Sequence, residues 1–467
     1  MGGNYGRDLF KQLQETIVKV DKLSSEISDL KNENVKLMSK IEALEKENTT
    51  LKLENQKLKD IINKDSSNSS KPPSSDGFNK IQNSREKTGR KPGGQPGHKG
   101  AEHKLFDNPT KIIELKTEKC QCGGAVRYSD KYKAKQVADI EIVTSIIEYR
   151  QMVGICECCN KVVNTPSPTS DIITYGNNLK SFWAMLSIEG VISINRIKQI
   201  IYELTLGQFN LSEGTIAKWN KDLSIHVAPA ICAIKEKLLA SPVNHEDETG
   251  IRVNKSLHWF HVLGNKTHTL YCSHKKRGNE ADKDMGILPS YSGILVHDHL
   301  KGLYSFTCRH AECNAHILRY LKSAVESKNR KWAQDMIKLL LYAKSGGKRS
   351  EVFKRYDDIL KDGQEEFLKD ESPDYNGEDM KLLRRMKQYK TEHLRFATDE
   401  DVPFDNNQAE RDLRMIKAKA KISGCFRAAD GGEVFATLKS YTSTLRKNGC
   451  NISDAICSAF DGSPVLF

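Results

Sequence analysis

The sequence predicts a multidomain chain that combines α-helices with an α/β core. Three features predict it: a heptad repeat near the N-terminus, a cluster of cysteines among β-rich runs, and a C-terminal half in which β-rich runs alternate with helical segments. The chain has 467 residues, which is long enough for about two to four domains.

Charge and composition exclude several classes of protein. Lys and Arg number 73 against 61 Asp and Glu, which gives a net charge of +12, and 38% of the residues are hydrophobic. Such a chain is too apolar to be wholly disordered, and it has no apolar run long enough to cross a membrane. Because residues 1–11 lack the apolar core of a secretory signal, the twelve cysteines are expected to be thiols or metal ligands.

Residues 8–64 predict a coiled coil. Apolar residues alternate at spacings of four and three from Leu13 to Ile62, and six successive leucines occupy position d of the heptad, from Leu23 to Leu58. Three asparagines at position a would fix the register and the number of strands. The pattern indicates a homodimer or higher oligomer, and a long helix that packs on its own chain is the alternative.

Residues 65–104 predict a basic flexible linker. The segment has almost no aliphatic residues, and it carries a net charge of +5 between Lys71 and Lys104. Basic side chains among glycines and prolines can follow a phosphate backbone or enter a minor groove, so Arg90, Lys91 and Lys99 are candidate DNA contacts. A solvated linker without such contacts is equally compatible with this composition.

Residues 105–170 predict a small β module that binds zinc, with strands expected at 140–143 and 146–149. The candidate ligands form two pairs: Cys120 with Cys122, and Cys156 with Cys159, for which Cys158 is a substitute. Zn²⁺ binds four thiolates in a tetrahedron, and a short turn supplies two of them at once. Buried free thiols are the alternative interpretation.

Residues 171–235 predict a helical region that could bind DNA. Helical spacing occurs at 179–188 and 194–204, and Ser212 has the position of an N-cap for a third helix, which carries Lys218. A helix, a glycine-containing turn and a short helix resemble a helix-turn-helix, in which Lys218 would contact DNA. Ordinary helical packing explains the pattern equally well.

Three carboxylates on separate elements are candidate catalytic residues. Asp247 precedes a predicted hairpin, Asp298 ends a short apolar strand, and Glu410 lies in the first turns of a helix that Asp405 or Asn406 would cap. The order strand, hairpin, helix, strand and helix is that of a ribonuclease H-like core, where three carboxylates can bind two Mg²⁺ ions for phosphodiester chemistry. Each carboxylate taken alone is more often a solvated surface acid.

The core is predicted in two pieces, residues 236–325 and 396–467, which an α-helical insertion at 326–395 separates. Beyond Glu410, basic residues crowd one short stretch and could hold the scissile strand through its phosphates. They are Arg411, Arg414, Lys417, Lys419 and Lys421. A solvated helix face is the alternative.

Nearly the whole chain resembles the transposases of the insertion-sequence 66 family, which are DDE transposases. The segments that carry the resemblance are residues 71–75 and 93–98 of the linker, the cysteine pairs, and residues 247–249, 296–298 and 405–411. The resemblance assigns the acid triad to Asp247, Asp298 and Glu410. Glu246 and Glu248 flank Asp247 and are alternatives at the first position.

The resemblance implies an enzyme that binds the ends of an insertion sequence and catalyses Mg²⁺-dependent cleavage and strand transfer. It implies structural Zn²⁺, and it implies transposon-end DNA and target DNA as partners. Whether element-encoded helper proteins also take part is left open by the sequence. A bacterial cytoplasmic protein, associated with the nucleoid when bound to DNA, is expected. The alternatives are a non-catalytic dimeric DNA-binding regulator, including a domesticated transposase, and a nuclease that performs no joining.

Overall fold

The computed structural model describes residues 3–62, 104–169, 171–370, 375 and 377–467. The linker residues Arg90, Lys91 and Lys99 therefore lie outside the described residues. None of the described helices combines the length and apolarity that a bilayer span requires. The chain divides into two compact units: Met1–Gln82 with His316–Leu339 and Tyr356–Arg384, and Asn83–Ala315 with Leu340–Arg355 and Arg385–Phe467.

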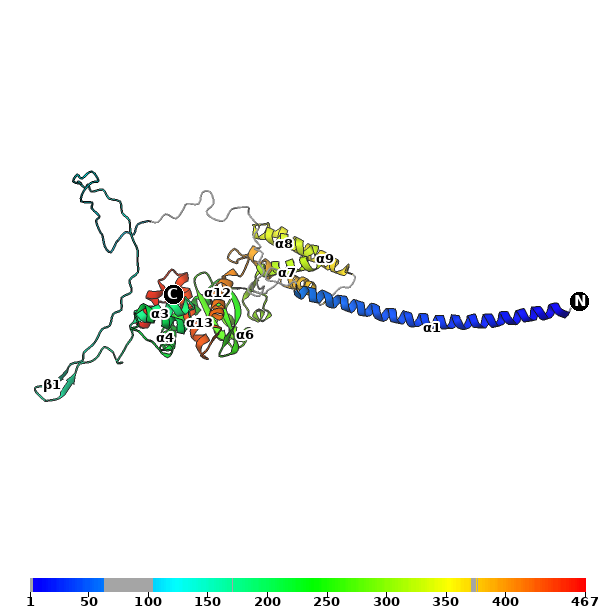
Figure 1. Ribbon diagram of the computed structural model, residues 1–467, viewed down its shortest axis with the longest axis horizontal. Helices are drawn as coiled ribbons and strands as arrows, with labels where there is room; N and C mark the ends of the chain where they lie inside the picture. Colours follow the sequence, from blue (N-terminus) through cyan, green and yellow to red (C-terminus); the bar gives the residue numbers. More distant parts are fainter. Residues whose placement is uncertain (1–2, 63–103, 170, 371–374, 376) are drawn as a thin grey trace. The chain divides into compact units, whose positions relative to one another are not determined.

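In the first unit, α1 (Gly3–Ile62) is one unbroken helix of 60 residues, drawn in blue in Figure 1. Its length is about 90 Å at the usual rise per residue. The six heptad leucines from Leu23 to Leu58 are each between 50% and 59% exposed. A seam of half-exposed leucines favours a partner helix that would cover it, and that pairing stays a prediction.

The first unit also contains parts of the helical segment between residues 314 and 388. Its helices are α7 (Asn314–Lys328), α8 (Lys331–Lys344), α9 (Arg349–Leu368) and α10 (Glu378–Gln388). Arg330 is only 3% exposed, and its guanidinium donates to Asp379 at 3.0 Å and also pairs with Asp370. This buried ion pair joins the start of α8 to the end of α9 and the start of α10.

The second unit is built on a mixed sheet of six strands, which confirms the predicted α/β class. The strands are β3 (Val243–Val253), β4 (Ser256–Gly264), β5 (Thr269–His274), β6 (Ile294–His297), β7 (Arg309–Glu312) and the short β8 (Cys425–Phe426). Their order is β5-β4-β3-β6-β7, with β8 paired to β3. Strands β3, β4 and β5 are antiparallel, whereas β6 and β7 run parallel to β3.

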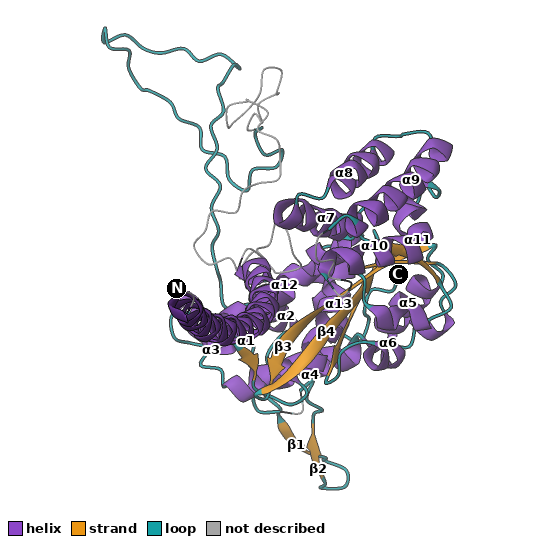
Figure 2. Cartoon of the chain, turned by 90° about the vertical axis from the view of Figure 1, so that its right-hand side faces the viewer, coloured by secondary structure: helices purple, strands orange, loops and turns teal. Residues whose placement is uncertain are grey.

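Helices cover both faces of this sheet, as Figure 2 shows. The helices are α5 (Ala228–Leu239) and α6 (Asn279–Met285) on one side, and α12 (Asn407–Ser423) and α13 (Gly431–Lys447) on the other. We call these sides the α6 face and the α12 face. Leu263 of β4 packs in the cluster on the α6 face, and its neighbour Val262 packs in the cluster on the α12 face.

The two faces divide the acidic residues of β3. Glu246 pairs with Leu263 and Asp247 pairs with Val262 in the antiparallel ladder. Directly opposite residues project to the same side, and successive residues of a strand project to opposite sides. Asp247 therefore faces α12, whereas Glu246 and Glu248 face α6, so the two glutamates do not share the side on which Asp247 lies.

The three helices predicted within residues 171–235 are confirmed. They are α2 (Asn177–Ile188), α3 (Ile194–Leu204) and α4 (Glu213–His226), followed by α5. They enclose an apolar cluster that includes Trp183 and Trp219. Ser212 caps α4, because its hydroxyl accepts a hydrogen bond of 3.0 Å from the backbone N–H of Thr215. The C-terminal helix α14 (Ile452–Phe460) packs beside α2.

Residues 104–169 contain one short hairpin, β1 (Val153–Ile155) with β2 (Val162–Asn164). The strands expected at 140–143 and 146–149 are wrong, because the chain there forms no regular element. Ile140 is 87% exposed and Val143 is 78% exposed. Alternating apolar residues stabilise a strand only when a partner strand and a core are available, and these side chains pack on neither among the described residues.

Candidate active site

Two of the three candidate acids lie on neighbouring parallel strands. The pairing of β3 with β6 runs from Val243 opposite Ile294 to His245 opposite Val296. Two residues further, the same register sets Asp247 against Asp298, which directly follows β6. Neighbouring strands are about 4.8 Å apart, so the two carboxylates lie beside one another at the end of the shared ladder.

Asn406 fixes the third acid against the sheet. Its side chain is fully buried, with Oδ1 2.9 Å from Nδ1 of His245 and Nδ2 donating at 2.6 Å to the carbonyl of Glu246. These bonds attach the start of α12 to β3, and Glu410 follows one turn into α12. The sequence suggested Asn406 only as an N-cap, yet its side chain makes no capping bond.

The negative charges of Asp298 and Glu410 both act on Asp247, although ligand atoms of the three acids do not all lie within 4.8 Å of one another among the described residues. Burial raises the pKa of the Asp247 carboxyl to about 7, and the negative charges of Asp298 and Glu410 both contribute to the rise. The positive charge of Lys417 and a 2.8 Å hydrogen bond from the backbone N–H of Glu248 act in the opposite direction. Side chains from β3, β6 and α12 thus act on one carboxylate.

The buried carboxylate of Glu312, which sequence reasoning missed, binds side chains of the loop that follows Asp298. Glu312, at the end of β7, is 2% exposed and accepts hydrogen bonds through both of its oxygens. The groups that bind it are His299 at 2.5 Å, Tyr304 at 2.6 Å, His393 at 3.0 Å and Arg385 at 3.2 Å. Because His299 is adjacent to Asp298, this network orients the acid. Arg385 and His393 are 73 and 81 positions from Glu312, so no local motif identifies the whole network.

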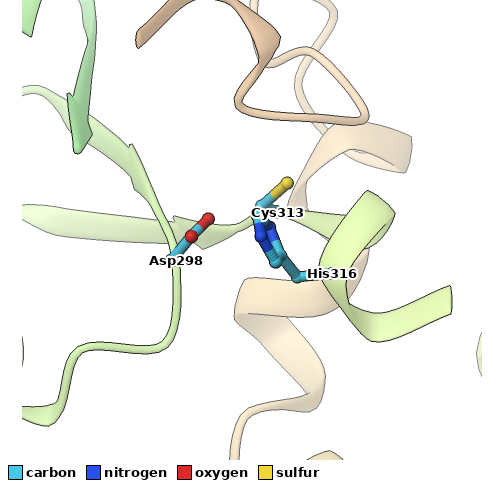
Figure 3. A group of neighbouring side chains, drawn as sticks. All are labelled: Asp298, Cys313 and His316. Carbon is cyan, nitrogen blue, oxygen red and sulfur yellow. The ribbon is translucent and has the colours of Figure 1, made fainter. Parts of the chain in front are cut away.

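Cys313 is a second neighbour of Asp298. A carboxylate oxygen of Asp298 and the Sγ of Cys313 are within 4.8 Å of one another, and Figure 3 shows them at the ends of neighbouring strands. The sulfur also accepts a hydrogen bond of 3.2 Å from the backbone N–H of Asn406. Cys313 therefore connects β7 to the start of α12. Figure 3 also labels His316, which belongs to the first unit.

The basic residues after Glu410 divide between the two sides of α12. The side chains that reach solvent are those of Arg411, Arg414, Lys417 and Lys421. Lys419 is the exception, because it is 9% exposed, its Nζ lies 5.7 Å from the ring centre of Phe435, and burial lowers its pKa. Position 419 follows the buried positions 413 and 416 at helical spacing, so the side chain of Lys419 does not reach solvent with the other four, and a DNA contact by Lys419 stays a prediction.

Each predicted zinc pair forms its own turn. In the first, the N–H of Cys120 donates to the carbonyl of Gly124 at 2.9 Å. In the second, hydrogen bonds involving the backbone of Cys159 and its thiol lower the pKa of Cys156, in a loop that β1 and β2 flank. The structure does not bring three of these cysteines within 4.8 Å of one another within residues 104–169, so a shared zinc site stays a prediction.

Replacing Asn406 tests whether its side chain holds α12 on the sheet. Asn406→Ala leaves the backbone carbonyl of Glu246 and the ring of His245 without their buried partner. We expect the free energy of unfolding to fall by about 1–3 kcal/mol, measured by urea denaturation. Asn407→Ala is the matched control, because Asn407 is exposed at the first position of the same helix. Equal stability of the two variants would contradict the anchoring role.

Two family models match separate parts of the chain. Residues 173–434 match the model of the Transposase IS66 family, and residues 11–104 match a family of unknown function (DUF6444). No curated protein matches the chain. The first match includes the sheet, α12 and all three candidate acids, and it covers more than half of the sequence. The chain is therefore a member of the IS66 family of transposases.

Proposed function

We propose that this transposase is a DDE enzyme that binds the ends of an insertion sequence, cleaves the DNA backbone with Mg²⁺ and joins the freed 3′-hydroxyl to target DNA. Asp247, Asp298 and Glu410 are the catalytic residues of the proposal. The observation that carries it is the raised pKa of Asp247, to which Asp298 and Glu410 both contribute. A buried carboxylate with a strongly raised pKa beside other acids is typical of catalytic centres.

The sheet supports a ribonuclease H-like core. Its central strand β3 carries Asp247, the antiparallel hairpin β4-β5 lies on one side, and the parallel strands β6 and β7 lie on the other. The second acid follows the strand next to β3, and the third comes from a helix on the same face. This is the order of elements that the sequence led us to expect for such a core.

The carboxylates fit a divalent cation, because each negative charge among them disfavours the others and a cation removes that repulsion. Mg²⁺ prefers carboxylate oxygens as ligands. Asp247, Asp298 and Glu410 would hold it, and two bound Mg²⁺ ions stabilise the attacking and leaving oxygens in phosphoryl transfer. Asn406 and Glu312 keep the carboxylates in position, and Lys417 contributes positive charge beside them.

DNA contacts are proposed for exposed basic residues on two helices and for basic residues of the linker. Arg411, Arg414, Lys417 and Lys421 follow one side of α12, beyond the acids. Lys218 is exposed on α4, the third helix of the helix-turn-helix-like region. Exposed Lys and Arg side chains near a phosphodiester neutralise phosphates and release counterions. Arg90, Lys91 and Lys99 of the basic linker, which lie outside the described residues, are proposed as further DNA contacts.

Two further parts of the proposal concern assembly. Pairing of α1 would bring two subunits together, so that both transposon ends are handled in one complex. The pairs Cys120–Cys122 and Cys156–Cys159 would bind a structural Zn²⁺.

A cleavage assay on DNA that carries the ends of the element tests the proposed function. We expect the purified full-length protein to cleave this DNA with Mg²⁺, to give strand-transfer products with a target plasmid, and to do neither in EDTA. Mg²⁺ binding by titration calorimetry, lost in Asp298→Asn, provides a readout independent of cleavage. End binding without cleavage would favour a DNA-binding regulator, and cleavage without joining would favour a nuclease.

A further inference from the structure

A second group of ionisable side chains lies on the α6 face of the sheet. Glu246 of β3, His261 of β4 and Asp282 of α6 are 2%, 0% and 0% exposed. One ligand atom from each residue lies within 4.8 Å of the ligand atoms of the other two. The group is distinct from the candidate active site, because Glu246 and Asp247 project from opposite faces of β3.

The polar atoms of this group have no hydrogen-bond partner among the described residues. They are Oε1 of Glu246, both ring nitrogens of His261 and both carboxylate oxygens of Asp282. Buried polar atoms are nearly always paired with protein, water or an ion. Unpaired atoms on three fully buried side chains that face one another therefore indicate a ligand between them.

The distances fit the ligand shell of a tetrahedral metal ion. Nδ1 of His261 lies 3.3 Å from Oδ1 of Asp282 and 3.6 Å from Oε1 of Glu246. These distances are long for hydrogen bonds. Zinc bonds of about 2.0–2.2 Å in a tetrahedron separate neighbouring ligand atoms by roughly 3.3–3.6 Å. Both distances from Nδ1 are thus those of ligands around one ion, and the third pair of ligand atoms lies within 4.8 Å.

We propose that Glu246, His261 and Asp282 bind one structural Zn²⁺ ion through Oε1, Nδ1 and Oδ1. Zn²⁺ accepts imidazole nitrogen together with carboxylate oxygen, whereas Mg²⁺ prefers oxygen ligands alone. Two carboxylates neutralise the dication, so the burial of the group leaves no net charge. The second oxygen of Asp282 or a water molecule supplies the fourth ligand. The ion joins α6 to β3 and β4 behind Asp247.

The far side of the imidazole ring supports this assignment. Oε2 of Glu248 lies 3.8 Å from Nε2 of His261, and Glu248 also forms an ion pair with Arg277. A metal-binding histidine usually directs its second N–H at a carboxylate, which selects the tautomer that binds the metal. Glu248 has the position of that carboxylate, and Nδ1 is then the nitrogen that faces Glu246 and Asp282.

A proton is the competing occupant. Burial alone would lower the pKa of His261, but the carboxylates of Asp282 and Glu246 outweigh it and raise the pKa to about 10. A protonated imidazole between two carboxylates would hold the same three elements together without any metal. The two occupants differ in a measurable way: only a bound metal makes the stability of the protein depend on zinc.

Zinc content of the full-length protein tests the proposal. Replacing Cys120, Cys122, Cys156, Cys158 and Cys159 with serine removes the other predicted zinc ligands, and in that background we expect one zinc per chain by mass spectrometry after dialysis. Adding Asp282→Asn or Glu246→Gln should abolish this zinc. Asp284→Asn is the matched control and should retain it, because Asp284 lies on the same helix with its side chain 63% exposed.

Thermal unfolding of the cysteine-substituted protein gives a readout that needs no change at the proposed site. After treatment with EDTA, saturating Zn²⁺ should raise Tm by roughly 5–10 °C, and Mg²⁺ should not. A zinc-free chain with the same Tm in EDTA and in Zn²⁺ would show that a proton occupies the group and overturn the proposal. Zinc retained in both Asp282→Asn and Glu246→Gln would also overturn it.

Discussion

Asp247→Asn should reduce strand cleavage by on the order of 10³-fold or more, with binding to the transposon ends unchanged. Asparagine keeps the size of the side chain but removes the negative charge that the proposed Mg²⁺ site requires. Asp247 is the candidate acid whose pKa both of the others, Asp298 and Glu410, raise. The measurement is product formation on a labelled end substrate, alongside a gel-shift assay for end binding.

The stability of this variant separates a chemical defect from a folding defect. The folded pKa of Asp247, about 7, lies above the ordinary aspartate value of about 4, so this carboxyl destabilises the metal-free fold increasingly as pH rises from about 4 to about 7, and the full penalty remains above that. Asp247→Asn should therefore have a Tm at pH 8 in EDTA that is equal to or higher than the wild-type value. Loss of cleavage with a lowered Tm would point to misfolding instead.

The control for the chemistry is Asp401→Asn, which removes an exposed carboxylate from the loop that precedes α12. It should cleave like the wild-type protein. Mg²⁺-dependent cleavage that survives in Asp247→Asn would remove the acid triad from the proposal. The family membership of the chain and the zinc proposal would both survive that outcome, because neither depends on Asp247.

Local patterns predicted elements well where the deciding interactions are themselves local. Ser212 caps α4 through a hydrogen bond within its own turn, and β6 is a short apolar run next to Asp298. Helical spacing would also have identified Lys419 as a buried position, had it been applied residue by residue. In contrast, residues 140–149 have an alternating pattern but no partner strand, which local sequence does not reveal.

The parts of the site that sequence reasoning missed depend on contacts between distant segments. Asn406 reaches His245 across 161 positions, and Glu312 reaches His393 across 81. Asp282 meets His261 only because α6 packs on the sheet formed by β3, β4 and β5. No motif spacing encodes such pairs in a single sequence. Their identification requires the register of the sheet and the helix that covers each face.

Leu30→Lys with Leu37→Lys in α1 should convert the protein from a dimer, or a higher oligomer, to a monomer. Both leucines are at position d and are 59% and 50% exposed in the single chain, so pairing would bury them against the partner helix. Replacing a buried leucine costs about 2–5 kcal/mol, and two lysines per helix add charge to the seam. Light scattering after gel filtration measures the mass.

The matched control is Asn32→Lys with Ser39→Lys, which adds the same charge at position f, on the outer side of the same helix. Lysine is a good helix former, so both double variants should keep α1 helical by circular dichroism, and only the position d variant should become monomeric. The position d variant should also fail to form a complex that holds two transposon ends, whereas its binding to a single end should persist. If the wild-type protein is already a monomer, α1 packs on its own chain and the heptad pattern has another cause.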